Sequence, residues 1–123
     1  MIALLVALLM IAFTGVVSAA QVDLRAQLTG NAINGVQPRG EARFREDQGR
    51  REFRTTVQDV NLPAGTELDV AVEGTTVGTI VLEDNNDGEL RLGRQVPAME
   101  AGDTVTVAKP DGTVILSGQL RPN

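Results

Sequence analysis

Apolar and polar residues alternate along much of the chain after residue 20. Segments 22–28, 42–45 and 53–58 each place an apolar or small side chain at every second position. A period of two buries one face of a β-strand and leaves the other face in solvent. No segment beyond residue 20 shows the period of about 3.6 residues that is typical of an amphipathic helix. The pattern predicts an all-β domain.

Segment 40–60 is predicted to form a hairpin. A two-residue turn at Gln48 and Gly49 would place Phe44 directly opposite Phe53. Aromatic pairs of this kind stabilise antiparallel strands. We therefore expect both phenylalanines on the inner face and the intervening arginines on the outer face.

Two later stretches, residues 64–82 and 101–116, resemble each other. The matching positions recur at one constant interval: Gly65 and Gly102, Val70 and Val107, Val77 and Val114. Further upstream, Gly40–Phe44 is echoed by Gly88–Leu92. An internal duplication would explain the series, and so would the common reuse of Gly-Thr turns and alternating valines in small β-proteins. The residues leave both explanations open.

Each of the two stretches is predicted to form its own hairpin. A turn that begins at Gly74 would pair Val72 with Val77, because glycine tolerates the positive φ of a type II′ turn. A type I turn over residues 109–112 would pair Val107 with Val114.

Strands and turn signals at intervals of roughly 8–12 residues indicate a sandwich or a small barrel. We expect a single antiparallel β-sandwich of about seven or eight strands, immunoglobulin-like or of a related topology, in residues 21–123. A domain of this size can bury one core without disulfides or metals.

Residues 1–20 form an apolar run that ends in small residues, Thr14 to Ala20. This pattern is typical of a secretory signal peptide cleaved after Ala19 or Ala20. The usual Lys or Arg before the apolar run is missing. The alternative is an uncleaved membrane anchor, because a segment of this length just spans a bilayer.

The composition removes most catalytic chemistry. The chain of 123 residues has no Cys, His, Trp or Tyr, and its serines are Ser18 and Ser117. Disulfides, thiol catalysis and histidine-based acid–base chemistry are therefore excluded. We expect a protein that is not an enzyme and has no cofactor. A hydrolase that uses only carboxylates is the unfavoured alternative, because no acidic pair stands in an apolar setting.

Six arginines cluster between residues 39 and 54, in a chain whose net charge is −5. Acidic residues are interleaved with them, so a solvated outer face is one interpretation. The other is a surface for an acidic partner, with Arg43, Arg45 and Arg54 as the candidate contact residues. An acidic chain does not favour nucleic acid, whose binding depends on phosphate neutralisation. With two phenylalanines expected inside, no aromatic platform remains for sugars or bases.

Segment 83–88 resembles the opening of a calcium loop, with Glu83, Asn85 and Asp87 as candidate ligands. The position that should carry a bidentate glutamate holds Arg94 instead. We therefore interpret the segment as a turn and expect no metal site.

These patterns predict a non-catalytic exported module, structural or protein-binding, that is secreted, periplasmic or on the cell surface. The alternative is a self-assembling surface or filament subunit that uses an edge strand or the first strand, Val22–Leu28. The expected partner is a protein or a second copy. We expect contact with a membrane only if residues 1–20 are not cleaved.

We expect the leader to be removed on export, because small residues follow its apolar run. Intact-mass measurement of the exported protein should show a chain that starts at Ala20 or Gln21. Recovery of the protein from membranes with residues 1–20 still attached would indicate an anchor instead.

Overall fold

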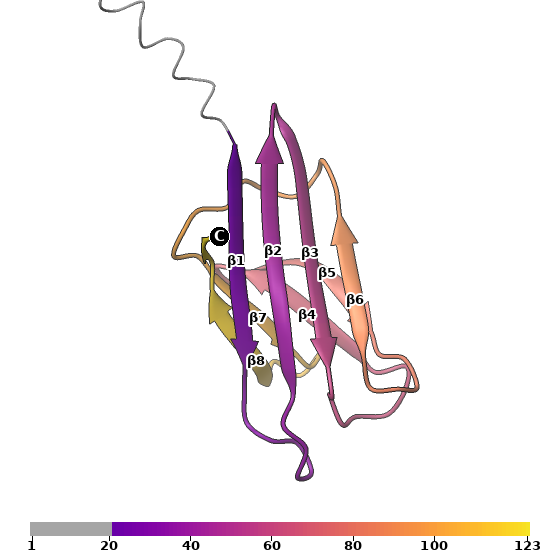
Figure 1. The fold of residues 1–123 in the computed structure, drawn as a ribbon. Helices are drawn as coiled ribbons and strands as arrows, with labels where there is room; N and C mark the ends of the chain where they lie inside the picture. The colour runs from indigo at the N-terminus through magenta and orange to yellow at the C-terminus, as the bar shows by residue number, and fades with distance from the viewer. Residues whose placement is uncertain (1–20) are drawn as a thin grey trace, which may run out of the picture.

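A computed structural model describes residues 21–123, which form one antiparallel β-sheet without helices (Figure 1). The sheet has nine strands. These are β1 (Val22–Thr29), β2 (Arg39–Asp47), β3 (Arg50–Gln58), β4 (Glu67–Val72), β5 (Thr75–Val81), β6 (Gly88–Leu92), β7 (Thr104–Ala108), β8 (Val114–Gln119) and the short β9 (Arg121–Pro122).

The strands follow the order β5-β4-β7-β8-β1-β2-β3-β6, and β9 pairs with β1. The long strands β1, β2 and β3 and the shorter β6 form one layer, and β4, β5, β7 and β8 cross behind it (Figure 1). The two end strands then meet. A Cβ built on Gly78 of β5 would lie 2.7 Å from Cδ2 of Leu90 on β6. The sheet is therefore nearly closed into a barrel by side-chain packing.

The sheet changes direction between β1 and β8, which share one backbone pair, Thr29 with Ser117. Two glycines make this corner possible. A Cβ on Gly30 would collide with the backbone oxygen of Ile115, and one on Gly118 with the backbone oxygen of Gln27. Since only glycine permits so close a backbone approach, these positions let the two layers join at an angle.

The all-β antiparallel part of the predicted fold class is confirmed. The two-sheet sandwich is not confirmed, because the strands form one continuous sheet. Alternation alone cannot distinguish these architectures, since both bury every second side chain of each strand.

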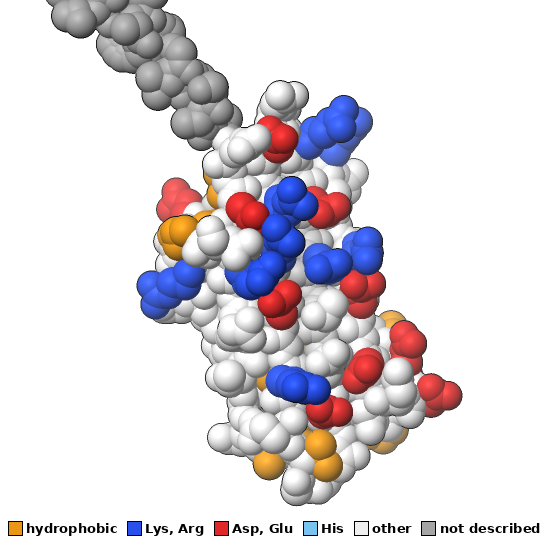
Figure 2. Space-filling view, in the orientation of Figure 1, with side chains coloured by type: hydrophobic (Ala, Val, Ile, Leu, Met, Phe, Trp, Pro, Cys, Tyr) orange, Lys and Arg blue, Asp and Glu red, His pale blue; other side chains and the backbone are white. Residues whose placement is uncertain are grey.

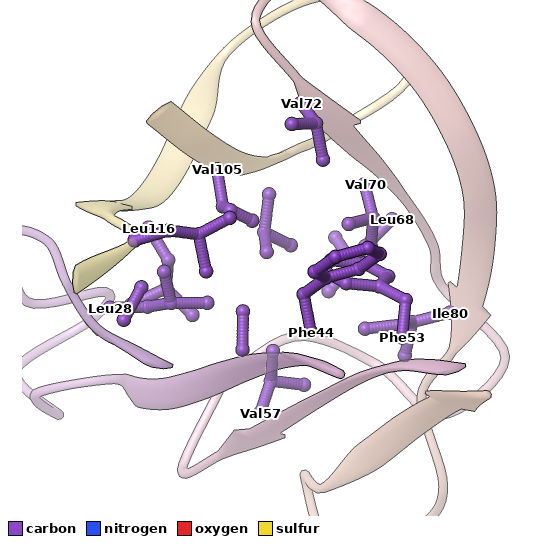
Figure 3. Close-up of a cluster of buried hydrophobic side chains, with 14 of the residues drawn as sticks. Leu28, Phe44, Phe53, Val57, Leu68, Val70, Val72, Ile80, Val105 and Leu116 are labelled. Carbon is purple, nitrogen blue, oxygen red and sulfur yellow. The ribbon is translucent and has the colours of Figure 1, made fainter. Parts of the chain in front are cut away.

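The interior is filled by aliphatic side chains from both layers and by Phe44 and Phe53, which are fully buried (Figure 3). The two phenylalanines are direct cross-strand partners, as predicted. The turn between them uses Gln48 and Gly49, which both have positive φ, 53° and 81°. That geometry matches a type I′ turn, which suits the twist of a hairpin.

The predicted registers of the two later hairpins are wrong. Val72 pairs with Thr75, because Glu73 and Gly74 both adopt positive φ and form the turn one residue earlier than expected. A shift in register at Val70 and Ala71 then leaves Val77 without a partner on β4.

In the second hairpin Val107 pairs with Leu116 instead of Val114. The predicted turn is present, since the N–H of Gly112 donates to the carbonyl oxygen of Lys109 at 2.8 Å. A shift at Val107 and Ala108 changes the register beyond it. A one-residue bulge changes every later cross-strand pair, and it cannot be recognised from the alternation of apolar and polar residues.

The resemblance between the two stretches extends to local hydrogen bonds. The N–H of Gly65 donates to the oxygen of Leu82 at 2.8 Å, and the N–H of Gly102 donates to the oxygen of Leu120 at 2.7 Å. Both glycines have positive φ. The two matching valines, Val70 and Val107, are partners between β4 and β7. The structure thus contains a repeated hairpin, and both explanations of its origin, duplication and the common reuse of such turns, stay open.

The predicted signal peptide or anchor, residues 1–20, lies outside the described residues. Among residues 21–123, the structure has no helix with the length and hydropathy that a membrane span requires.

Phe53→Ala should lower the free energy of unfolding by about 3–5 kcal/mol, because it leaves a cavity in a closed core. Val81→Ala is a suitable control, since Val81 on β5 is 54% exposed and should change stability by less than about 1 kcal/mol. Urea unfolding of both variants measures the difference. Equal losses would contradict the central position of Phe53.

Candidate binding surface

Five arginines stand in line across the outer face of the front layer, the solvent side of β1, β2, β3 and β6 together with the short β9 beside β1. The register places Arg121 beside Arg25, Arg25 beside Arg43, Arg43 beside Arg54, and Arg54 beside Arg91. We call this set the arginine row. It runs perpendicular to the strands, and Figure 2 shows basic side chains gathered in a band across this face.

Three members of the arginine row have acidic partners. Arg43 donates to Asp23 through two nitrogens, at 3.1 and 2.9 Å. Arg25 lies 3.6 Å from Glu41, and Arg91 lies 3.2 Å from Glu89. Arg25 Nε is also buried without a hydrogen bond to any described residue. The row is therefore only partly neutralised by the protein itself.

The acids come from the two neighbouring rows of the same face. One of these flanking rows contains Gln27, Glu41, Thr56 and Glu89, and the other contains Asp23, Arg45 and Glu52. Each lies about 6–7 Å from the arginine row, because it is two residues away along every strand. The face thus carries one positive stripe between two rows that are negative on balance.

The structure brings Arg43 and Arg54 together, as the sequence predicted. Arg45 lies on the same face but in a flanking row, opposite Glu52. Arg25, Arg91 and Arg121 were not among the predicted contact residues, because they come from strands outside the 40–60 hairpin. Two of the three could have been suspected from the sequence, because Arg25 and Arg91 each occupy an outward position in an alternating segment.

The cluster of six arginines does not stay together. Arg51 lies on the same side of β3 as the buried Phe53. Its Nη1 donates to the carbonyl oxygen of Val96 at 3.2 Å, and its Nε lies 3.4 Å from Glu46. Arg51 therefore holds the loop that contains Val96 in place over one end of the core.

Segment 83–88 forms a turn, as predicted. The N–H of Glu83 donates to the oxygen of Asp87 at 2.9 Å, and the side-chain oxygen of Asn85 accepts from the N–H of Asp87 at 3.2 Å. Among residues 21–123, no three acidic side chains are placed to hold a metal ion. The expected absence of calcium binding stays a prediction.

Two of the surface hollows bear on the candidate site. One, of about 470 Å³, is lined by Arg25, Gln27 and Arg121 together with the end of the chain, and so adjoins the arginine row. The other, of about 450 Å³, lies between residues 75–77 and 92–97, beside the β5–β6 seam. Arg94 is the one charged residue among those that line it. Neither hollow brings together a nucleophile and a base.

Comparison with protein-family models finds none that matches this chain, and comparison with curated proteins finds no significant match. The interpretation of the surface therefore rests on its own geometry.

The ion pair between Asp23 and Arg43 shifts the titration of both groups. The hydrogen bond from Arg43 lowers the pKa of Asp23 most, and a hydrogen bond from Asn123 adds to the effect. The same bond raises the pKa of Arg43. Both shifts favour the charged forms, so Asp23 holds a fixed negative charge beside the arginine row.

We expect Asp23 to titrate below the ordinary aspartate value of about 3.9, and Arg43→Gln to raise that pKa. Because the folded pKa lies below the unfolded one, this ion pair stabilises the fold above about pH 4. The contribution is lost as the pH falls through the folded value. Carbon-detected NMR titration of the carboxyl groups measures the shift.

Arg94→Gln is the matched control, since it removes one positive charge away from the row and should leave the Asp23 pKa unchanged. An equal effect of both substitutions would show that net charge, and not the paired geometry, sets the pKa.

Proposed function

We propose that this protein is a non-catalytic binding module that acts outside the cytoplasm and holds an acidic macromolecule on its arginine row. The single observation that carries the proposal is the alignment of five arginines from five strands. Export is supported by the leader-like residues 1–20, and the non-catalytic role by a composition without His or Cys.

The electrostatic repulsion between neighbouring arginines supports a binding role for the arginine row. Like charges directly opposite each other on neighbouring strands, with Cβ atoms about 5 Å apart, destabilise a sheet. Arg54 stands between Arg43 and Arg91, and so has an arginine on both sides. A bound anion would relieve this repulsion and would also make charge-assisted hydrogen bonds with the guanidinium groups.

A second copy of the chain is a second candidate partner, because the back layer differs in charge. Glu67, Asp69 and Glu73 follow one another along β4 and the turn after it. Unlike patches on one molecule favour head-to-tail contacts. Strand exchange through β1 is not favoured, since β1 already pairs with β2, β8 and β9.

The test is retention on two immobilised polyanions, poly-L-glutamate and polygalacturonate, at low salt and pH 7. A protein of net charge −5 should be repelled by both unless a local positive patch binds. We expect retention that weakens as the salt concentration rises above about 0.15 M. The combined variant Arg43→Gln, Arg54→Gln, Arg91→Gln should pass through unretained.

The matched control is the combined variant Arg39→Gln, Arg50→Gln, Arg94→Gln, which has the same net charge and an intact row. It should be retained like the wild type. Passage of the wild type through both columns would overturn the proposal, as would equal losses in the two variants. Light scattering on the same proteins tests self-association. If the partner is a second copy of the chain, the wild type and the control variant should self-associate, and the row variant should not.

A further inference from the structure

The acidic macromolecule can be defined further from the same surface. We propose that the ligand is a linear acidic polysaccharide that lies across the strands, with its carboxylates in single file along the arginine row. This inference rests on the proposed function and adds the class of ligand.

The spacing of the arginines suits such a polymer. Neighbouring strands are about 4.8 Å apart, so the row presents positive charges at regular steps over a span of about 19 Å. A stiff polymer with one carboxylate on each sugar carries anions along one line. Such a chain loses little conformational freedom on binding, whereas a flexible acidic peptide must order both its backbone and its side chains.

The narrow width of the arginine row also favours a single polymer chain. Glu41 and Glu89 lie on one side of the arginine row, and Asp23 and Glu52 lie on the other. A flat anionic surface such as a membrane would place negative charge over these acids as well as over the row. The flanking rows repel such a ligand and so restrict binding to a narrow one.

The outer face of the front layer has no large exposed apolar side chain among the described residues. The exposed large apolar residues among those described are Val36, Val81 and Val114, and none lies on the outer face of the front layer. Protein interfaces usually have an apolar or aromatic centre. Single-stranded nucleic acids and neutral sugars usually stack on aromatic rings. A polymer bound through its charge needs neither feature.

The face also offers hydrogen bonds to sugar hydroxyls. Gln27 and Thr56 stand in a flanking row, immediately beside the arginines. At the β9 end, the hollow of about 470 Å³ exposes Gln27 and Gln119 together with Arg25 and Arg121. One end of the row therefore offers an open hollow in which these side chains can contact part of a ligand.

Calorimetric titration with oligogalacturonates of increasing length tests the geometry. Affinity should rise with each added sugar and level off once the oligomer spans the row. The combined variant Arg43→Gln, Arg54→Gln, Arg91→Gln should bind about 100-fold more weakly, if each exposed contact contributes about 1 kcal/mol. The control variant Arg39→Gln, Arg50→Gln, Arg94→Gln should bind like the wild type, and circular dichroism should show that both variants are folded.

Three other probes separate the ligand classes. Methyl-esterified oligogalacturonate and vesicles of anionic phospholipid should not bind the wild type, and poly-L-glutamate with an equal number of charges should bind more weakly than the oligosaccharide. The double variant Glu41→Gln, Glu89→Gln should bind the oligosaccharide more tightly and should gain affinity for the vesicles.

Binding of poly-L-glutamate that equals or exceeds that of the oligosaccharide would overturn this inference and leave the proposed function standing. Binding of vesicles by the wild type would also overturn it, because the width of the ligand would then not matter. Binding of the methyl ester would overturn it as well, because the charge of the ligand would then not matter. If neither polyanion binds, the inference and the proposed function both fail.

Discussion

The pairing of Phe44 with Phe53 is the constraint on which both faces of the front layer depend. Side chains alternate along a strand, so the register that buries the two rings side by side also sets Arg43 beside Arg54 outside. A slip of one residue would expose the aromatic pair and bury arginines, at a cost of several kcal/mol. The core therefore maintains the geometry of the candidate binding surface.

The core does not, however, require arginine at those outer positions. Threonine, glutamine or mixed charges would fill them with less repulsion, as Gln27 and Thr56 do two residues away. The ion pairs of Asp23, Glu41 and Glu89 offset part of the repulsion and fix the directions of three guanidinium groups. The row is thus a property of the surface added to the fold, which is why we associate it with binding.

Local features were predictable from the sequence, and long-range ones were not. The β2–β3 hairpin was predicted correctly because its turn residues and aromatic pair lie close together in the chain. The pairing of β3 with β6 joins segments that are distant in sequence, so Arg91 was not recognised beside Arg54. The single continuous sheet depends on the corner at Gly30 and Gly118, whose role is visible only when the neighbouring backbone is placed.

The weak repeat in the sequence explains how a row of like charges can arise in this fold. Segments Gly40–Phe44 and Gly88–Leu92 both begin with Gly-Glu and place an arginine two residues after the glutamate. They lie on opposite sides of β3, and Gly40 and Gly88 both pair with Val57. One short motif, used twice in the same register around one strand, therefore supplies two of the five arginines of the row and both glutamates of a flanking row. Selection for the part of the row formed by Arg43, Arg54 and Arg91 would need to preserve only this motif and the strand between its copies.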